Sequence, residues 1–148
     1  MPKLYVTDTN AIISHFNEVF DEPPILSNKA NDIITQALND ASSDIRLSIP
    51  SVVFIEIFEA WFRTEEFARK FHYEVILRID QAPNVEIRAI DREVLENLLA
   101  IGGTLENHDI NDKLILASAI ALQCPLISTD SSIIKYVAET GAIPVVLS

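Results

Sequence analysis

Glycine, cysteine and basic residues are all scarce in this chain of 148 residues. Three glycines in the whole sequence supply neither the glycine-rich loop of P-loop proteins nor the glycine fingerprint of dinucleotide-binding folds. The single cysteine, Cys124, has no partner for an internal disulfide and stands in the apolar stretch ALQCPLI. This setting predicts a small core residue in a reducing compartment, and we therefore expect a cytoplasmic protein.

The charge balance is strongly acidic, with 11 lysines and arginines against 22 aspartates and glutamates and a formal net charge of −11. Such a balance argues against a broad basic face that grips nucleic acid through its phosphates. The acidic charge does not exclude a phosphate substrate that binds through cations, because clustered acids can hold such cations. No apolar run approaches the roughly 20 residues that span a bilayer, and MPKLYVTDTN lacks the pattern of a secretory signal. We expect no membrane association.

Strand-like and helix-like segments alternate along the chain without a repeat or a linker, which indicates one domain over residues 1–148. The strand-like runs are continuously apolar, as in a parallel sheet that helices cover on both faces. We therefore predict an α/β fold. The predicted strands are 3–7, 45–49, 85–90, 125–129 and 143–148, and the predicted helices are 9–20, 28–39, 51–63, 65–79, 92–101, 110–123 and 131–140.

Two similar stretches, LYVTDTNAII and PLISTDSSII, place an aspartate between hydroxyl residues where a predicted strand ends. These aspartates are Asp8 and Asp130. Either of them could cap the helix that follows it. Either could also hold a metal ion, because ligands of open parallel sheets bind outside the carboxyl ends of the strands. The second interpretation predicts that the two aspartates are neighbours in space.

Glu56 and Asp112 are two further candidate acids. Glu56 stands inside the apolar run VVFIEIF, and a buried carboxylate costs several kcal/mol unless it keeps its proton or faces a cation. Alternatively, it shares a solvated helix stripe with Glu59 and Arg63, and Glu59 is then the other candidate acid. Asp112 lies in the first turn of a predicted helix, where the helix dipole also favours an acid. Asp109, one turn earlier, could cap the same helix and is a further alternative.

Four acids at strand ends and near helix starts suit Mg²⁺ or Mn²⁺, which prefer carboxylate oxygens and bridge to phosphates. Without cations, such acids raise one another's pKa. Other chemistries lack their residues. No serine stands in a nucleophile-elbow pattern, and His15, His72 and His108 are too scattered for zinc spacing. His108, next to Asp109, could contact a substrate, but we expect it to be a solvated loop histidine.

The ordered set Asp8, Glu56, Asp112 and Asp130 resembles the acids of the PIN-domain family, and the resemblance covers essentially the whole chain. DTNAII resembles the first motif of the family and places Asp8 as its first acid. SVVFIEIFEAW is similar to the second motif and places Glu56. INDKLILASAIALQCPLISTDSSI resembles the closing motif and places Asp112 and Asp130.

The same motifs suggest four supporting residues: Thr9, Asn10, Lys113 and Ser128. Thr9 and Asn10 follow the first acid. Ser128 stands where the family usually has threonine. The family often has His-Asp-Arg at the third acid, whereas this chain has Asn111-Asp112-Lys113. Lys113 could contact a phosphate, although without the two-pronged geometry of arginine.

The resemblance implies a three-layer α/β/α sandwich with a central parallel sheet of four to five strands. It implies a Mg²⁺- or Mn²⁺-dependent ribonuclease with one or two metal ions, in which a metal-activated water cleaves RNA and leaves a 3′-hydroxyl and a 5′-phosphate. Many relatives are VapC-type toxins that pair with an antitoxin and form homodimers. An aromatic set could form the homodimer contact or could belong to the core: Phe58, Trp61, Phe62, Phe67 and Phe71.

Two alternatives to a nuclease stay open. A catalytically silent PIN-like module that binds a partner or serves as a scaffold fits the net charge of −11, although all four acids are present. A haloacid-dehalogenase-like phosphatase would use the aspartate of LYVTDTN. That chemistry needs a second acid two residues later, where this chain has Asn10.

Overall fold

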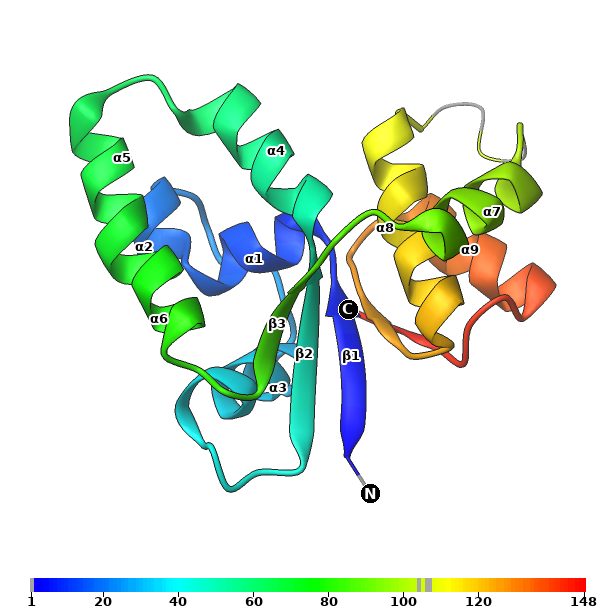
Figure 1. Cartoon of the computed structure of the whole chain (residues 1–148), viewed down its shortest axis with the longest axis horizontal. Helices are drawn as coiled ribbons and strands as arrows, with labels where there is room; N and C mark the ends of the chain where they lie inside the picture. The colour runs from blue at the N-terminus through cyan, green and yellow to red at the C-terminus, as the bar shows by residue number, and fades with distance from the viewer. Residues whose placement is uncertain (1, 104, 106–107) are drawn as a thin grey trace.

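The computed structural model describes residues 2–103, 105 and 108–148. Five parallel strands form one sheet in the order β3-β2-β1-β4-β5, and helices lie on both of its sides (Figure 1). The strands are β1 (Lys3–Thr7), β2 (Ile45–Pro50), β3 (Val85–Arg88), β4 (Leu126–Ile127) and β5 (Val146–Leu147). The predicted α/β fold with a central parallel sheet is confirmed. Four to five strands were expected, and the sheet has five.

The helices separate into two groups in Figure 1, where α1, α2, α5 and α6 lie to the left of the strands and α7, α8 and α9 to the right. None of the helices in the described part of the chain is long and apolar enough to cross a membrane. The helices are α1 (Thr9–His15), α2 (Asn17–Phe20), α3 (Asn28–Asn39), α4 (Ser51–Trp61), α5 (Glu65–Phe71), the π-helix η1 (His72–Ile76), α6 (Leu77–Asp80), α7 (Arg92–Ile101), α8 (Ile110–Leu122) and α9 (Ser131–Thr140).

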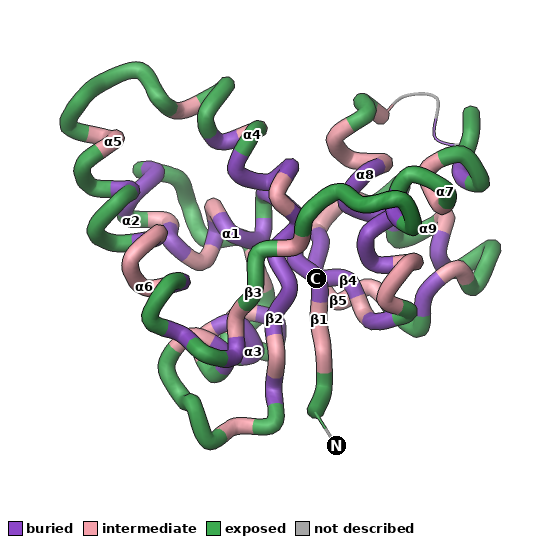
Figure 2. Tube along the Cα trace, viewed as in Figure 1, coloured by how far each residue is buried: buried purple, intermediate pink, exposed green. Residues whose placement is uncertain are grey.

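The core lies along the central strands and the helices packed on them (Figure 2). Leu47, Ser48 and Ile49 of β2 are 1%, 0% and 1% exposed, and because successive side chains point to opposite faces, both faces of this strand are covered. Residues 114–119 of α8 are all buried, so this helix is an interior helix with no solvated stripe in that stretch. Cys124 is the small core residue that its apolar neighbours predict, and burial raises the pKa of its thiol to about 11.

Two predicted helices are not regular. The predicted helix 9–20 is interrupted at Phe16, whose backbone leaves the helical conformation and joins α1 to α2. Phe16, Val19 and Phe20 are all buried, so the segment packs against the core on both sides of the interruption. The predicted helix 65–79 contains the π-helical turn η1 and continues to Asp80.

Several element ends also differ from prediction. The prediction gave β3, β4 and β5 as 85–90, 125–129 and 143–148, and each strand is shorter in the structure because hydrogen bonding to its neighbour stops earlier. α4 ends at Trp61 instead of residue 63. α8 ends at Leu122, because Gln123 adopts a left-handed backbone with φ of 50°.

The aromatic set divides between core and surface. Phe71 is 1% exposed, and Trp61 and Phe67 pack half-buried against the core and against Phe20. Phe58 and Phe62 touch each other with ring centroids 4.7 Å apart, yet they stay 47% and 38% exposed. The set is therefore neither wholly core nor wholly surface.

Candidate functional site

The strand order places the ends of β1 and β4 side by side. Asp8 directly follows β1, and its backbone N–H donates a 3.1 Å hydrogen bond to the carbonyl of Ile127 in β4. The Oδ1 atom of Asp8 accepts a 2.7 Å hydrogen bond from the N–H of Ala11 and so caps α1. Asp8 thus has the structural role of a helix cap at the edge where parallel sheets bind ligands.

Burial and neighbouring acids perturb the Asp8 carboxyl, which is 7% exposed. Burial raises the pKa of Asp8 from 3.8 to about 6, and the charges of Asp112 and Asp130 add to this rise. Hydrogen bonds from the Ser128 side chain and the Ala11 backbone lower the pKa but do not offset the burial. Ionisation of Asp8 in the folded chain therefore costs free energy, and a nearby cation would reduce that cost.

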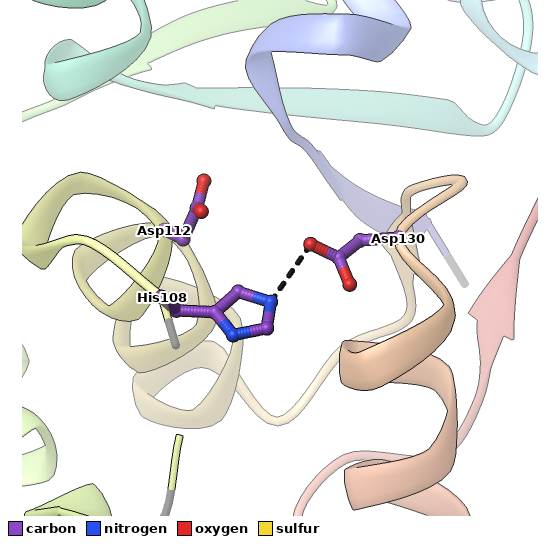
Figure 3. Close-up of side chains that lie close together, drawn as sticks. All are labelled: His108, Asp112 and Asp130. Atoms are coloured by element: carbon purple, nitrogen blue, oxygen red, sulfur yellow. Dashed lines mark hydrogen bonds and ion pairs between the residues drawn. The ribbon is translucent and has the colours of Figure 1, made fainter. Parts of the chain in front are cut away.

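Asp130 uses its two carboxylate oxygens differently. Its Oδ1 atom accepts hydrogen bonds from the N–H groups of Ser132 (2.9 Å) and Ile133 (3.2 Å) and so caps α9. Its Oδ2 atom lies 2.8 Å from Nε2 of His108 (Figure 3). One oxygen thus fixes the helix, and the other stays directed toward the site.

Ser128 joins the two sequence stretches that end in aspartate. It is fully buried, its hydroxyl donates to the Asp8 carboxylate, and the same oxygen accepts a 3.1 Å hydrogen bond from the backbone N–H of Asp130. The Ser128 hydroxyl thus lies between Asp8 and Asp130, and the supporting role expected for it stays a prediction.

Asp112 lies in the first turn of α8, and Asp109 caps that helix. The Oδ1 atom of Asp109 accepts a 3.0 Å hydrogen bond from the N–H of Asp112. With Asp109 acting as the cap, the half-buried side chain of Asp112 needs no capping role. Burial raises the pKa of Asp112, the charges of Asp109 and Asp130 raise it further, and His108 lowers it.

Glu56 approaches from the second turn of α4. Thr9 donates a 2.7 Å hydrogen bond from its hydroxyl to Oε1 of Glu56, which joins α1 to α4. Burial raises the pKa of Glu56, the Thr9 hydrogen bond lowers it, and the charges of Asp112, Asp109 and Asp8 raise it. The half-buried Glu56 therefore belongs electrostatically to the same cluster.

Three other predicted residues lie further from this cluster or face elsewhere. Glu59 is exposed one turn beyond Glu56 along α4, away from the strand ends. Lys113 donates a 3.2 Å hydrogen bond from its ammonium group to the Gly102 carbonyl at the end of α7. Asn10 is exposed and lines a shallow cavity with Ile13 and other residues of α1 and its surroundings. Their supporting or alternative roles stay predictions.

The expectation of a solvated His108 was wrong. Its side chain is 9% exposed, and its ring faces Asp130. His108 lies in an irregular segment, where periodicity gives no indication of burial. The available signal was its position next to Asp109, just before the helix that carries Asp112.

The closest group of possible metal ligands in the described part of the chain is formed by His108, Asp112 and Asp130, whose ligand atoms all lie within 4.8 Å of one another (Figure 3). Ligands about 2.1 Å from one octahedral ion stand about 3 Å apart when adjacent and about 4.2 Å apart when opposite. The three side chains therefore fit a small divalent cation after a modest inward movement. Asp8 and Glu56 lie outside this closest group.

Comparisons with known proteins place this geometry in a family. The model of the PIN-domain family matches residues 5–139. No curated protein matches the sequence.

Solved structures with the same fold cover nearly the whole chain. A chain from the structure of VapBC2 of Rickettsia felis, bound to a DNA fragment from its promoter, matches with a TM-score of 0.65 and 17% identity, over 97% of this chain and 96% of that one. VapBC-1 of nontypeable Haemophilus influenzae matches with a TM-score of 0.62 and 17% identity, over 92% and 93%. VapBC-5 of Mycobacterium tuberculosis, a toxin–antitoxin system, matches with a TM-score of 0.56 and 18% identity, over 99% and 98%.

Proposed function

Because this chain belongs to the PIN-domain family, we propose that it is a Mg²⁺- or Mn²⁺-dependent ribonuclease that cleaves RNA phosphodiesters. One observation carries the proposal. Four acids from separate segments lie close enough to interact at the carboxyl end of the sheet: Asp112 and Asp130 raise the pKa of Asp8, and Asp112 and Asp8 raise the pKa of Glu56. Acids so placed suit hard divalent cations, and such cations bring an acidic protein together with a polyanionic substrate.

The acids of the site would have separate roles in the proposed cleavage. Asp112 and Asp130, with their ligand atoms already close, would hold the cation. Asp8, held in place by hydrogen bonds from Ala11 and Ser128, would supply a further anionic oxygen to the cation. When bound, a divalent cation lowers the pKa of a coordinated water and offsets charge on a phosphodiester under attack.

Glu56 would act beside the metal ligands. The Thr9 hydroxyl holds one of its oxygens at 2.7 Å, so the side chain is oriented before any substrate arrives. The pKa of Glu56 is raised toward neutral pH, which suits a group that orients or deprotonates water.

We further propose that the enzyme is the toxin of a type II toxin–antitoxin pair and forms a homodimer. Likeness to the VapBC chains supports an antitoxin partner. Three apolar side chains are 38–47% exposed and supply a surface for the homodimer: Ile55 and Phe58 in α4, and Phe62 directly after it. Light scattering would test this, with Phe58→Lys expected to convert a dimer to a monomer without changing the fold measured by circular dichroism.

RNA cleavage with a chelator control tests the catalytic proposal. Wild type should cut a mixed RNA pool with Mn²⁺ or Mg²⁺ and lose activity in excess EDTA. Asp130→Asn and Asp112→Asn should lose at least about a hundredfold in rate, whereas Asp91→Asn, which changes a comparable helix cap at α7, should keep full activity. Equal activity in all variants would refute the site.

A silent PIN-like module is the second candidate, favoured by the net charge of −11. Thermal unfolding with and without Mn²⁺ separates the two candidates. Metal at 100 times its Kd adds about 2.7 kcal/mol of stability to a protein that binds it. Stabilisation of wild type that is lost in Asp130→Asn supports a metal site, and no shift in either protein favours the silent module.

A further inference from the structure

The ring of His108 lies where a metal ligand would stand. Its Nε2 atom is 2.8 Å from Oδ2 of Asp130, close to the roughly 3 Å that separates adjacent ligands of one small cation. The side chain is 9% exposed, so its ring is held inside the site instead of moving freely in solvent. Figure 3 shows the ring between the first turn of α8, which carries Asp112, and the start of α9.

The direction of the two side chains supports the same conclusion. The Oδ1 atom of Asp130 is fixed by two backbone N–H groups at the start of α9, so the Oδ2 atom that faces His108 is the oxygen left for a cation. Asp112 completes the group, with the ligand atoms of all three residues within 4.8 Å. A cation that used Asp112 and the free oxygen of Asp130 would therefore meet the imidazole.

Imidazole changes which cation such a site prefers. Mg²⁺ strongly favours oxygen ligands and water, whereas Mn²⁺, Co²⁺ and Zn²⁺ also accept imidazole nitrogen, with affinity that generally rises along this series of metals. Two carboxylates alone give little discrimination between Mg²⁺ and Mn²⁺. One added nitrogen shifts the preference toward the transition metal.

We propose that His108 is a direct ligand of the cation and makes this site select Mn²⁺ or a related transition-metal ion over Mg²⁺. The proposal rests on the metal site of the proposed function and goes beyond the four acids that define it. The opposite arrangement is an imidazole that occupies the cation position and must leave before any metal binds. The two arrangements predict opposite effects when the ring is removed.

Metal binding to the whole chain, measured by calorimetry with Mn²⁺ and with Mg²⁺ in the same buffer, tests the proposal. Wild type is compared with His108→Ala and with His108→Gln, whose side-chain amide can still bond Asp130 but offers a metal only an oxygen. His72→Ala is the matched control, because His72 is an exposed histidine on η1. Circular dichroism and thermal unfolding without metal verify that each variant is folded.

The expected result is a loss of roughly tenfold or more in Mn²⁺ affinity for both His108 variants, with Mg²⁺ affinity little changed and His72→Ala like wild type. Tighter binding of both metals in His108→Ala would overturn the proposal, because the ring would then block the site. Equal losses for both metals, or no change, would overturn it as well. Absence of binding in wild type would instead refute the metal site itself.

A spectroscopic measurement gives a readout that a purely positioning role would not move. Electron spin-echo measurements on the Mn²⁺-loaded protein should show coupling of the metal to an imidazole nitrogen. The coupling should be present in wild type and in His72→Ala and absent in His108→Gln. Its absence from the wild-type complex would overturn direct ligation, whatever the affinities.

Discussion

Replacing Asp8 with asparagine should make the metal-free protein more stable at neutral pH. Burial and the charges of Asp112 and Asp130 raise the pKa of Asp8 from 3.8 to about 6 in the folded chain. A rise of this size corresponds to about 3 kcal/mol of folding free energy lost once the group is ionised. Asparagine has no charge, and its amide oxygen can still accept the 2.7 Å hydrogen bond from Ala11 that caps α1.

The sign of the pH dependence follows from which state holds the proton more tightly. The folded state binds the Asp8 proton up to about pH 6, whereas the unfolded chain releases it near pH 3.8. Stability contributed by this group therefore falls as pH rises through that window and is lowest above it. Asp8→Asn should gain about 3 kcal/mol at pH 8 and close to nothing at pH 4.

Urea denaturation with a chelator present measures this difference. The matched control is Asp91→Asn, which alters another aspartate cap, since Asp91 accepts a 3.0 Å hydrogen bond from Val94 at the start of α7. The control should show no comparable gain, because Asp91 is exposed and stands beside Arg88. Saturating Mn²⁺ should reverse the order of wild type and Asp8→Asn. A loss of about 1 kcal/mol in metal-free Asp8→Asn, as for a removed cap, would refute the reasoning.

Three further outcomes follow from the same contacts. Thr9→Val should destabilise the fold by about 1.5 kcal/mol and slow RNA cleavage, since it removes the 2.7 Å hydrogen bond to Glu56; urea denaturation and a cleavage assay should find Thr9→Ser close to wild type. Phe71→Ala should cost about 3–5 kcal/mol in urea denaturation, because the ring is 1% exposed, whereas Phe62→Ala should cost less than about 1 kcal/mol in the monomer. Calorimetry should show Mn²⁺ affinity falling as pH drops below about 6, because the Asp8 proton then competes with the metal.

Sequence patterns predicted the positions of the strands because these are short segments rich in valine, isoleucine and leucine between proline, asparagine, aspartate and serine residues. The neighbouring positions of Asp8 and Asp130 followed from the same pattern, since each comes directly after a predicted strand of a parallel sheet. The interruption at Phe16 could not be predicted, because the sequence has no glycine or proline there that would end a helix. The short strands β4 and β5 depend likewise on pairing between segments that are distant in the sequence.

The site was predicted less completely than the fold. Acids at strand ends have a recognisable position, and the structure brings all four into one electrostatic cluster. His108 has no such position, because it lies in an irregular segment next to Asp109 and far along the chain from Asp130. Only tertiary structure brings its ring to 2.8 Å from that carboxylate.

The choice between helix cap and metal ligand, which the sequence leaves open for Asp8 and Asp130, is not exclusive in the structure. A carboxylate has two oxygens, and a cap needs one of them. In Asp130 the Oδ1 atom caps α9 while Oδ2 faces His108. Capping then has a consequence for binding, because backbone N–H groups hold the carboxylate in place before a cation arrives, so less ordering is required on binding. An asparagine keeps the cap and removes the charge, whereas an alanine removes both, and a comparison of the two substitutions separates the roles at each aspartate.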